Sequence, residues 1–254
     1  MELVVDSDHL GTTELQWASS ARLAALKELA ITPPERVLVV APHPDDEVFG
    51  AGGLLQALLG TLARVEFIAV TDGEASHPDA RAEMGIDLRQ VRAAESERAL
   101  ARLGCGSPSI ARLGIPDGRV VDHAESLSDL LAGMLRPGDL CLAPWWHDGH
   151  PDHDASGAAA LRAARTAGAT FLGYLVWAWH WTSPERDEVP WELCRRFGFS
   201  RRVAARKRWA TGAFRSQTTV LGAGAHEDPV LPAPLLRRFW RSYEVFVTDP
   251  GHVG

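Results

Sequence analysis

Short apolar runs alternate with amphipathic segments of helical spacing from residue 36 to about residue 180. The first run, Arg36 to Ala41, is mostly β-branched and stops at Pro42, which is typical of a strand buried on both faces of a parallel sheet. The alternation predicts an α/β fold with a Rossmann-like, doubly wound, mostly parallel sheet and helices on both faces. The expected strands are Arg36–Ala41, Val65–Val70, Ser109–Leu113, Leu140–Ala143 and Thr170–Trp179, and the expected helices are Pro44–Gly60, Asp87–Leu103, Ala124–Leu135 and Pro151–Gly168.

The region after residue 180 is less regular. Glu244 to Thr248 is expected to add a strand at the edge of the sheet, and Ser183–Pro190 and Gly222–Pro234 are expected to be loops. The 254 residues contain no internal repeat and no linker long enough to separate two domains. A single domain over residues 1–254 is therefore predicted.

The charge balance argues against a nucleic-acid partner. The chain carries 26 basic and 33 acidic residues, and its net charge of −7 opposes binding to phosphate polymers. One segment does gather basic residues, but no base-stacking aromatic residues are interleaved with them, so a solvated helix face is expected there. These residues are Arg195, Arg196, Arg201, Arg202, Arg206, Lys207 and Arg208.

The cysteines and the N-terminal segment favour a cytoplasmic protein without a membrane span. Three cysteines at wide spacing form no CxxC pair and are expected to be reduced, mostly buried thiols. The first 20 residues carry acidic residues where a signal peptide has basic ones. No apolar run approaches the roughly 18 residues that a membrane span needs.

Imidazoles and carboxylates follow two of the expected strands. Ligands of open α/β sheets bind beyond the carboxyl ends of the strands. There, the first strand is followed by His43, Asp45 and Asp46, and the fourth is followed by residues 147–154, HDGHPDHD. His43, Asp46 and His153 together match the nitrogen and oxygen ligand set of a catalytic Zn²⁺ site, and Fe²⁺ would suit the same set.

A structural interpretation of these acidic residues remains open. Asp45, Asp46 and Asp152 each stand where a helix is expected to begin, and carboxylates there offset unpaired N–H groups and the helix dipole. This interpretation does not explain His153, because a charged imidazole in a first helical turn is unfavourable whereas a neutral, metal-bound one is not. A third His-Pro-Asp tripeptide, His77 to Asp79, is followed by Ala80 and is not expected to bind metal.

The segment APHPDDEVFGAGG, together with the later HPDH, resembles the PIG-L (LmbE-like) family of zinc-dependent deacetylases. Supporting similarities are TDGEA at 71–75, Arg92 and Glu95, LGIPDG at 113–118, and the segment from Lys207 to Gln217. The resemblance covers about residues 36–217. It implies an LmbE-like fold and hydrolysis of an N-acetyl or other N-acyl group from a small molecule that contains an amino sugar, or from a related amide.

The resemblance also implies roles for individual residues. It makes His43, Asp46 and His153 the zinc ligands and Asp45 the general base. His150 would stabilise the oxyanion or donate a proton, and Asp152 would orient His150. Chemically, Zn²⁺ acidifies water, and a carboxylate removes the proton so that the oxygen can attack the amide carbonyl.

Three further residues are candidate substrate ligands. Asp72 and Asp117 would bind sugar hydroxyls, although each precedes a glycine and would equally stabilise a turn. Arg92 would contact substrate, or would form a surface ion pair with Glu95 or Glu97 on its own helix. Aromatic residues expected to line a pocket or to pack in the core are Trp145, Trp146, Trp177, Trp179, His180 and Trp181.

Two other functions stay open at the level of sequence. One is a noncatalytic metal- or sugar-binding module on the same fold, although such a module would have no need of an acid like Asp45 beside the ligands. The other is a dinucleotide-dependent oxidoreductase, suggested by the glycines from Gly50 to Gly53 and by Asp72. These glycines lie nine or more residues after the strand, which is too far for a phosphate-binding turn. The sequence gives no indication of oligomeric state.

Overall fold

A seven-stranded sheet runs through the computed structural model, which describes residues 11–78, 85–221 and 228–252. The strand order is β3-β2-β1-β4-β5-β7-β6, and the five strands from β3 to β5 pair in parallel. β7 pairs antiparallel with both β5 and β6. The strands are β1 (Arg36–Ala41), β2 (Arg64–Ala69), β3 (Ser109–Arg112), β4 (Leu140–Pro144), β5 (Thr170–Tyr174), β6 (Cys194–Gly198) and β7 (Tyr243–Thr248).

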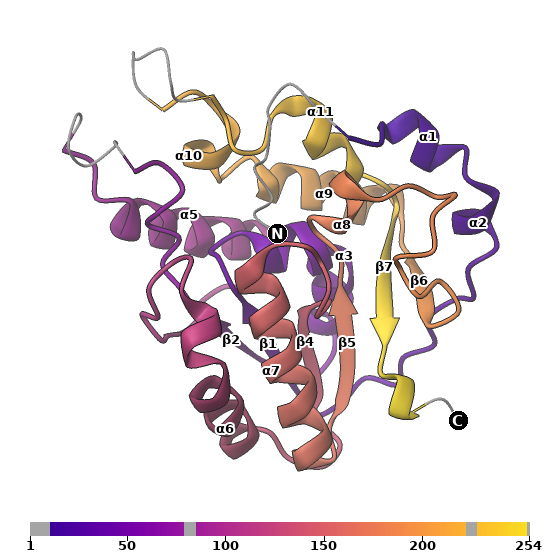
Figure 1. The fold of residues 1–254 in the computed structure, drawn as a ribbon, viewed down its shortest axis with the longest axis horizontal. Helices are drawn as coiled ribbons and strands as arrows, with labels where there is room; N and C mark the ends of the chain where they lie inside the picture. Colours follow the sequence, from indigo (N-terminus) through magenta and orange to yellow (C-terminus); the bar gives the residue numbers. More distant parts are fainter. Residues whose placement is uncertain (1–10, 79–84, 222–227, 253–254) are drawn as a thin grey trace.

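Helices cover both faces of the sheet, as Figure 1 shows. α6 and α7 pack on one face, and α3, α5 and α9 pack on the other. The longer helices are α3 (Asp46–Leu59), α5 (Leu88–Leu103), α6 (Ala124–Met134), α7 (Pro151–Ala167) and α9 (Arg201–Thr211). The short ones are α1 (Glu14–Ala18), α2 (Ala21–Ala24), α8 (Ala178–Trp181), α10 (Arg215–Thr218), α11 (Ala233–Leu236), η1 (Val120–His123), η2 (Arg237–Phe239) and η3 (Pro250–His252).

The side chains of β1 explain why its sequence is continuously apolar. Val37 and Val39 belong to the core beneath α3 and α5, whereas Leu38 and Val40 belong to the core beneath α6 and α7. Because successive side chains of a strand point to opposite faces, a strand covered on both faces needs apolar residues at every position. The predicted doubly wound α/β fold is confirmed.

Most predicted elements lie within one or two residues of the observed ones, but two strands differ. The expected strand Thr170–Trp179 ends at Tyr174, and the chain then turns into α8. The carboxylate of Asp148 accepts hydrogen bonds from three backbone N–H groups of residues 176–178, which draws the chain away from the sheet. The strand at Glu244–Thr248 is β7, which lies one position inside the edge.

The edge position belongs to β6, which the sequence pattern did not predict. Its sequence, Cys-Arg-Arg-Phe-Gly, is charged and short, without a clean alternation of apolar and polar residues. The expected loop Gly222–Pro234 overlaps α11, which begins at Ala233, and residues 222–227 lie outside the described part of the chain. Cys105, Cys141 and Cys194 carry free thiols. None of the described helices combines the length and apolarity that a membrane crossing demands.

The basic segment is not a uniformly solvated helix face. Lys207 on α9 is 1% exposed, and its ammonium donates to the Phe49 carbonyl at 2.7 Å and to Glu244 Oε1 at 2.6 Å. Glu244 on β7 also accepts the backbone N–H groups of Gly53 and Leu54 in α3. This buried ion pair therefore joins α9 and β7 to the helix that follows β1.

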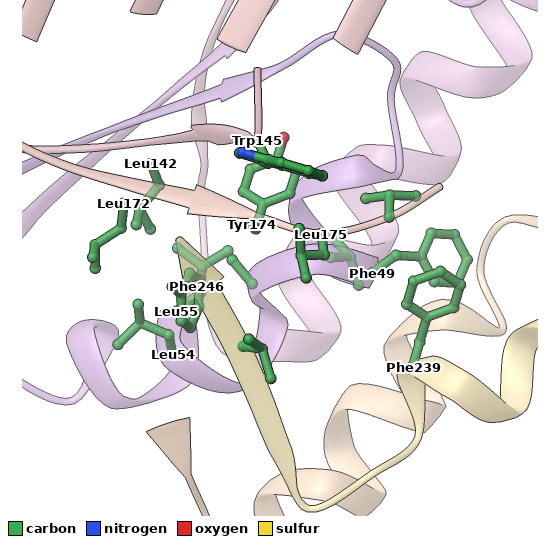
Figure 2. Packing of buried hydrophobic residues seen from close by; sticks show 14 of the residues in the cluster. Phe49, Leu54, Leu55, Leu142, Trp145, Leu172, Tyr174, Leu175, Phe239 and Phe246 are labelled. Carbon is green, nitrogen blue, oxygen red and sulfur yellow. The ribbon is translucent and has the colours of Figure 1, made fainter. Parts of the chain in front are cut away.

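The glycines of α3 serve packing and do not form a phosphate-binding turn. They lie inside the helix, where a Cβ atom on Gly50 would be 2.2 Å from the Tyr174 ring and one on Gly53 would be 2.2 Å from the Phe199 ring. Figure 2 shows Phe49, with other α3 side chains, in the same apolar core as Tyr174. The feature that suggested a dinucleotide-dependent oxidoreductase thus has a structural explanation.

Candidate metal and active site

Two loops at the carboxyl ends of β1 and β4 bring the predicted metal ligands together. His43 follows β1, Asp46 is the first residue of α3, and His153 lies in the first turn of α7. His43 is 8% exposed, Asp46 is 3% exposed and His153 is fully buried. The backbone N–H of His43 donates to Asp46 Oδ2 at 2.8 Å, which fixes the shape of the first loop.

The inward-facing atoms of these three residues form a nearly equilateral triangle. His43 Nδ1 lies 3.3 Å from both His153 Nε2 and Asp46 Oδ2, and the last two atoms lie 3.2 Å apart. A tetrahedral zinc ion with ligand bonds of about 2.0 to 2.1 Å holds its ligand atoms about 3.3 Å from one another. The triangle therefore has the size of one face of a zinc coordination tetrahedron.

Carboxylates on the outer side of both imidazoles set their tautomers. His43 Nε2 lies 3.1 Å from Asp117 Oδ1 and 3.3 Å from Asp152 Oδ2, and His153 Nδ1 lies 2.9 Å from Asp148 Oδ2. Ionised carboxylates only accept hydrogen bonds, so each outer nitrogen carries a proton, and a neutral ring then has its lone pair on the inner nitrogen. In that state two lone pairs and one carboxylate oxygen converge on one point, where a positive charge, either a metal ion or protons on the imidazoles, stabilises them.

The electrostatics of the triangle also favour positive charge. Burial opposes a charge on His153, but Asp46 and Asp148 outweigh it and raise the pKa of the imidazole to about 9. Burial likewise opposes ionisation of Asp46, yet His153 and His43 hold the pKa of its carboxyl far below its usual range. The site thus keeps an ionised carboxylate between two imidazoles whose surroundings favour a cation, which is the behaviour expected of a metal site.

Asp45 lies beside the triangle and is paired with a buried arginine. Arg92 is 3% exposed, so the expected alternative of a surface ion pair with its own helix is wrong. Its guanidinium donates to Asp45 Oδ2 at 3.0 Å and to the Gly73 carbonyl at 2.8 Å. Gly73 has a φ of +65°, and a Cβ atom there would be 2.1 Å from the guanidinium. Burial raises the pKa of the Asp45 carboxyl to about 6, although Arg92 acts in the opposite direction.

His150 is held by backbone and aromatic contacts. Its Nδ1 accepts the backbone N–H of Asp152 at 3.2 Å, so Nε2 carries the proton of the neutral ring. The ring stacks on Trp177 with centroids 5.9 Å apart. Burial and the neighbouring His153 and His43 lower the pKa of His150 to about 3. His150 is therefore a neutral hydrogen-bond donor in this structure.

The carboxylate of Asp152 does not orient His150, in contrast to the prediction. It contacts His43 and accepts the backbone N–H groups of Gly118 at 2.7 Å and Val120 at 3.1 Å. The reason is geometric, because the first turn of α7 directs this side chain toward the loop after β3. Asp152 thus supports the candidate ligand His43 and also fixes the loop that carries Asp117.

A cavity of about 270 Å³ opens over the triangle. Its polar lining residues are His43, Asp45, Asp46, Ser76, Arg92, Asp117, His150 and Gln217. Its apolar lining residues are Phe49, Val176, Trp177, Val230 and Leu231. A cavity with this mixed lining suits a small ligand that has hydroxyl or amide groups and also apolar surface.

The candidate substrate ligands differ in their positions. Asp117 and Arg92 line the cavity, whereas Asp72 does not and instead pairs with Arg112 at 2.5 Å. His77 is buried outside the cavity, and Asp79 of the same tripeptide lies outside the described residues.

Two residues near the site received no role from the sequence. Asp148 is part of the segment HDGHPDHD, and its place five residues before the candidate ligand His153 is the sequence signal that points to it. Gln217 ends the segment from Lys207 and carries no such signal. The structure places Asp148 against His153 and Gln217 in the cavity wall.

Several known proteins are similar to this chain in sequence. A family model described as PIG-L, GlcNAc-PI de-N-acetylase, matches residues 38–164. The chain is 29% identical over 138 residues to diacetylchitobiose deacetylase of Thermococcus kodakarensis, covering 53% of this chain and 51% of that protein. It is 31% identical over 140 residues to a probable N-acetyl-α-D-glucosaminyl L-malate deacetylase 2 of Bacillus subtilis, covering 51% of this chain and 60% of that one. The chain thus spans about half of one relative and three fifths of the other.

Solved structures show the same fold. N,N'-diacetylchitobiose deacetylase from Pyrococcus horikoshii, complexed with its inhibitor MPG, superposes with a TM-score of 0.62 at 21% identity, covering 86% of this chain and 85% of that one. The zinc-inhibited form of teicoplanin deacetylase Orf2 superposes with a TM-score of 0.61 at 17% identity, covering 85% and 99%.

Proposed function

Because this chain belongs to the PIG-L family of GlcNAc-PI de-N-acetylases, we propose that it is a metal-dependent hydrolase. It removes an N-acetyl or other N-acyl group from a small molecule that contains an amino sugar. The observation that carries this proposal is the triangle of His43, Asp46 and His153 beside Asp45, an acid that is not needed for metal binding. The relatives named above are deacetylases of N-acetylglucosamine compounds, which supports the substrate class.

His43, Asp46 and His153 would hold the ion, and the ligand set favours Zn²⁺ with Fe²⁺ as a second fit. A divalent ion bound there lowers the pKa of water and polarises a carbonyl oxygen. Asp117 and Asp152 hold the His43 ring in place, and Asp148 does the same for His153. The three free thiols suit a reducing compartment, and we place the reaction in the cytoplasm.

Asp45 serves as the general base and Arg92 positions it. An ionised Asp45 accepts a proton from water, and the water oxygen forms a bond to the amide carbon. The burial that raises the pKa of Asp45 to about 6 brings its basicity close to neutral pH. The carbon–nitrogen bond then breaks as Asp45 returns that proton to the leaving nitrogen, so the products are a carboxylate and an amine.

His150 stabilises the oxygen on which negative charge develops. Its Nδ1 is occupied by the Asp152 backbone, so Nε2–H is the donor available to the cavity. A neutral donor already in place needs no reorganisation during the reaction. Stacking on Trp177 fixes the plane of the ring.

The first experiment measures metal content and turnover together. Inductively coupled plasma mass spectrometry should find about one zinc or iron per chain in the wild type and in Asp45→Ala, and little in His43→Ala. Turnover of an N-acylated amino sugar should fall by about 10²- to 10⁴-fold in Asp45→Ala. The matched control is Asp72→Ala, an aspartate outside the cavity, which should keep both metal and turnover.

Other outcomes separate the alternatives. Loss of metal in Asp45→Ala, to the same extent as in His43→Ala, would reject the role of Asp45 as base. Metal in the wild type without hydrolysis of any N-acyl amino sugar would favour the noncatalytic binding module. No metal even after zinc is added would refute the proposed hydrolase.

A further inference from the structure

A buried glutamate on α5 anchors α10 at the wall of the cavity. Glu95 lies one helical turn after Arg92 and is 3% exposed. Both of its oxygens bind Ser216, because Oε1 accepts the backbone N–H at 2.9 Å and Oε2 accepts the hydroxyl at 2.6 Å. The same helix therefore positions the proposed general base Asp45 through Arg92 and the residue after Ser216 through Glu95.

The hydrogen bonds around Gln217 determine how its amide is oriented. The Ser216 hydroxyl has one proton and gives it to Glu95, so its contact with Gln217 at 3.1 Å must be a bond donated by Nε2. Nε2 also donates to Ser76 Oγ at 3.2 Å. Both amide protons are therefore used within the protein.

The oxygen of the same amide is left for a ligand. Gln217 lines the cavity, and within residues 11–78, 85–221 and 228–252 no group donates a hydrogen bond to Oε1. The backbone carbonyl of Gln217 accepts the N–H of Leu231, so the residue is fixed at both ends. An acceptor that is held rigidly at a cavity wall selects ligands that bring a donor to it.

We propose that Gln217 Oε1 accepts a hydrogen bond from a hydroxyl group of the amino sugar, and that Gln217 is thereby a specificity-determining residue. This inference rests on the proposed function for the substrate class. Ser216 and Glu95 act as positioning residues, because they reach the substrate only through the amide of Gln217. A substrate without the matching hydroxyl leaves Oε1 unpaired in a largely dehydrated wall and binds less well.

The experiment compares substrates and variants in one matrix. Metal-loaded wild type, Gln217→Leu and Ser216→Ala are assayed for kcat/KM with N-acetylglucosamine and with its 3-deoxy, 4-deoxy and 6-deoxy analogues. For one analogue, the wild-type kcat/KM should be at least about tenfold lower than that for N-acetylglucosamine. The ratio of the two kcat/KM values should fall toward one in Gln217→Leu. Ser216→Ala should lower the same ratio in part. Thr219→Ala, an exposed residue beyond the end of α10, is the matched control and should keep the wild-type ratio.

A second measurement does not depend on turnover. Calorimetry with glucosamine and the corresponding deoxy amines should show the same selective loss of affinity in Gln217→Leu, with metal content unchanged. An equal loss for the parent compound and every analogue, or no discrimination by the wild type, would overturn the proposal. If the wild type hydrolyses no N-acyl amino sugar, the proposed function fails, and the calorimetric ratios still decide the role of Gln217.

Discussion

Replacing Asp148 by asparagine tests how far the metal site depends on a residue that does not touch the metal. Asp148 is fully buried, and each of its oxygens accepts two N–H groups. Oδ1 accepts those of Val176 at 3.0 Å and Ala178 at 3.1 Å. Oδ2 accepts that of Trp177 at 2.8 Å and faces His153 Nδ1 at 2.9 Å. Asparagine offers only one oxygen, so it cannot serve both pairs.

Each orientation of the new amide has a defined cost. If its NH₂ group faces His153, the imidazole must present a lone pair there and carry its proton on Nε2, the atom that faces the metal. Loss of such a supporting hydrogen bond typically weakens metal binding by about 10- to 100-fold. The Trp177 N–H also loses its acceptor in this orientation, at about 1–3 kcal/mol. If the NH₂ group faces Val176 and Ala178, two buried N–H groups lose their acceptor at about 1–3 kcal/mol each. The metal-free protein would then be less stable by about 2–6 kcal/mol.

Two assays distinguish these orientations. Competition with a fluorescent chelator gives the zinc Kd, and urea unfolding of the metal-free protein gives the free energy of unfolding. The matched control is Asp154→Asn, which changes the residue after His153 on α7. There the remaining oxygen can still accept the N–H of Gly149 that Asp154 Oδ1 accepts at 2.9 Å. An Asp148→Asn protein with wild-type zinc affinity and wild-type stability would refute the reasoning.

Two further predictions concern the other buried ion pairs. Arg92→Gln removes the positive charge that lowers the pKa of Asp45, so that pKa should rise above its value of about 6. Since the base acts when ionised, the acid limb of kcat/KM should move to higher pH, as a pH–rate profile would show. Lys207→Met leaves the Glu244 carboxylate buried without its partner and should lower the free energy of unfolding by about 3–5 kcal/mol in a urea titration.

Neighbouring arginines provide controls for both variants. Arg89→Gln removes an exposed charge from the same helix as Arg92 and should leave the acid limb in place. Arg206→Met changes an exposed residue beside Lys207 and should cost under about 1 kcal/mol. An acid limb that moves equally in Arg89→Gln, or a stable Lys207→Met protein, would contradict the respective argument.

The sequence predicted the parallel core and the positions of the two candidate metal-binding loops because both depend on local patterns. A strand buried on both faces must be apolar at every position, so the β1 run Arg36–Ala41 is visible without any tertiary information. Each of the two His-Pro-Asp segments contains or directly precedes its candidate ligands. These are His43 and Asp46 for the first segment and His153 for the second. Their meeting in space then follows from the rule that parallel strands end at the same edge of the sheet.

The features that the sequence did not predict depend on contacts between distant residues. The sequence suggested for Arg92 either a substrate contact or a surface ion pair within its own helix, yet its partner Asp45 lies 47 residues earlier. Glu95 binds Ser216 across 121 residues. Helical spacing alone cannot distinguish a charged residue that faces solvent from one that faces a partner on another element. The strand β6 was not predicted for a similar reason, because its position is determined by pairing with β7 and not by its own composition.

The buried charges around the site connect catalysis with stability. Four carboxylates that are at most 5% exposed surround two imidazoles; they are Asp45, Asp46, Asp148 and Asp152. Of these four, Arg92 forms an ion pair only with Asp45. Carboxylates removed from water are tolerated only where hydrogen bonds and cations compensate them. Backbone N–H groups and the outer imidazole nitrogens compensate Asp148 and Asp152, whereas the inner oxygen of Asp46 faces only the two imidazoles. The proposed cation would compensate Asp46, so its binding would add to the free energy of folding, and removal of the metal should lower the stability of the protein.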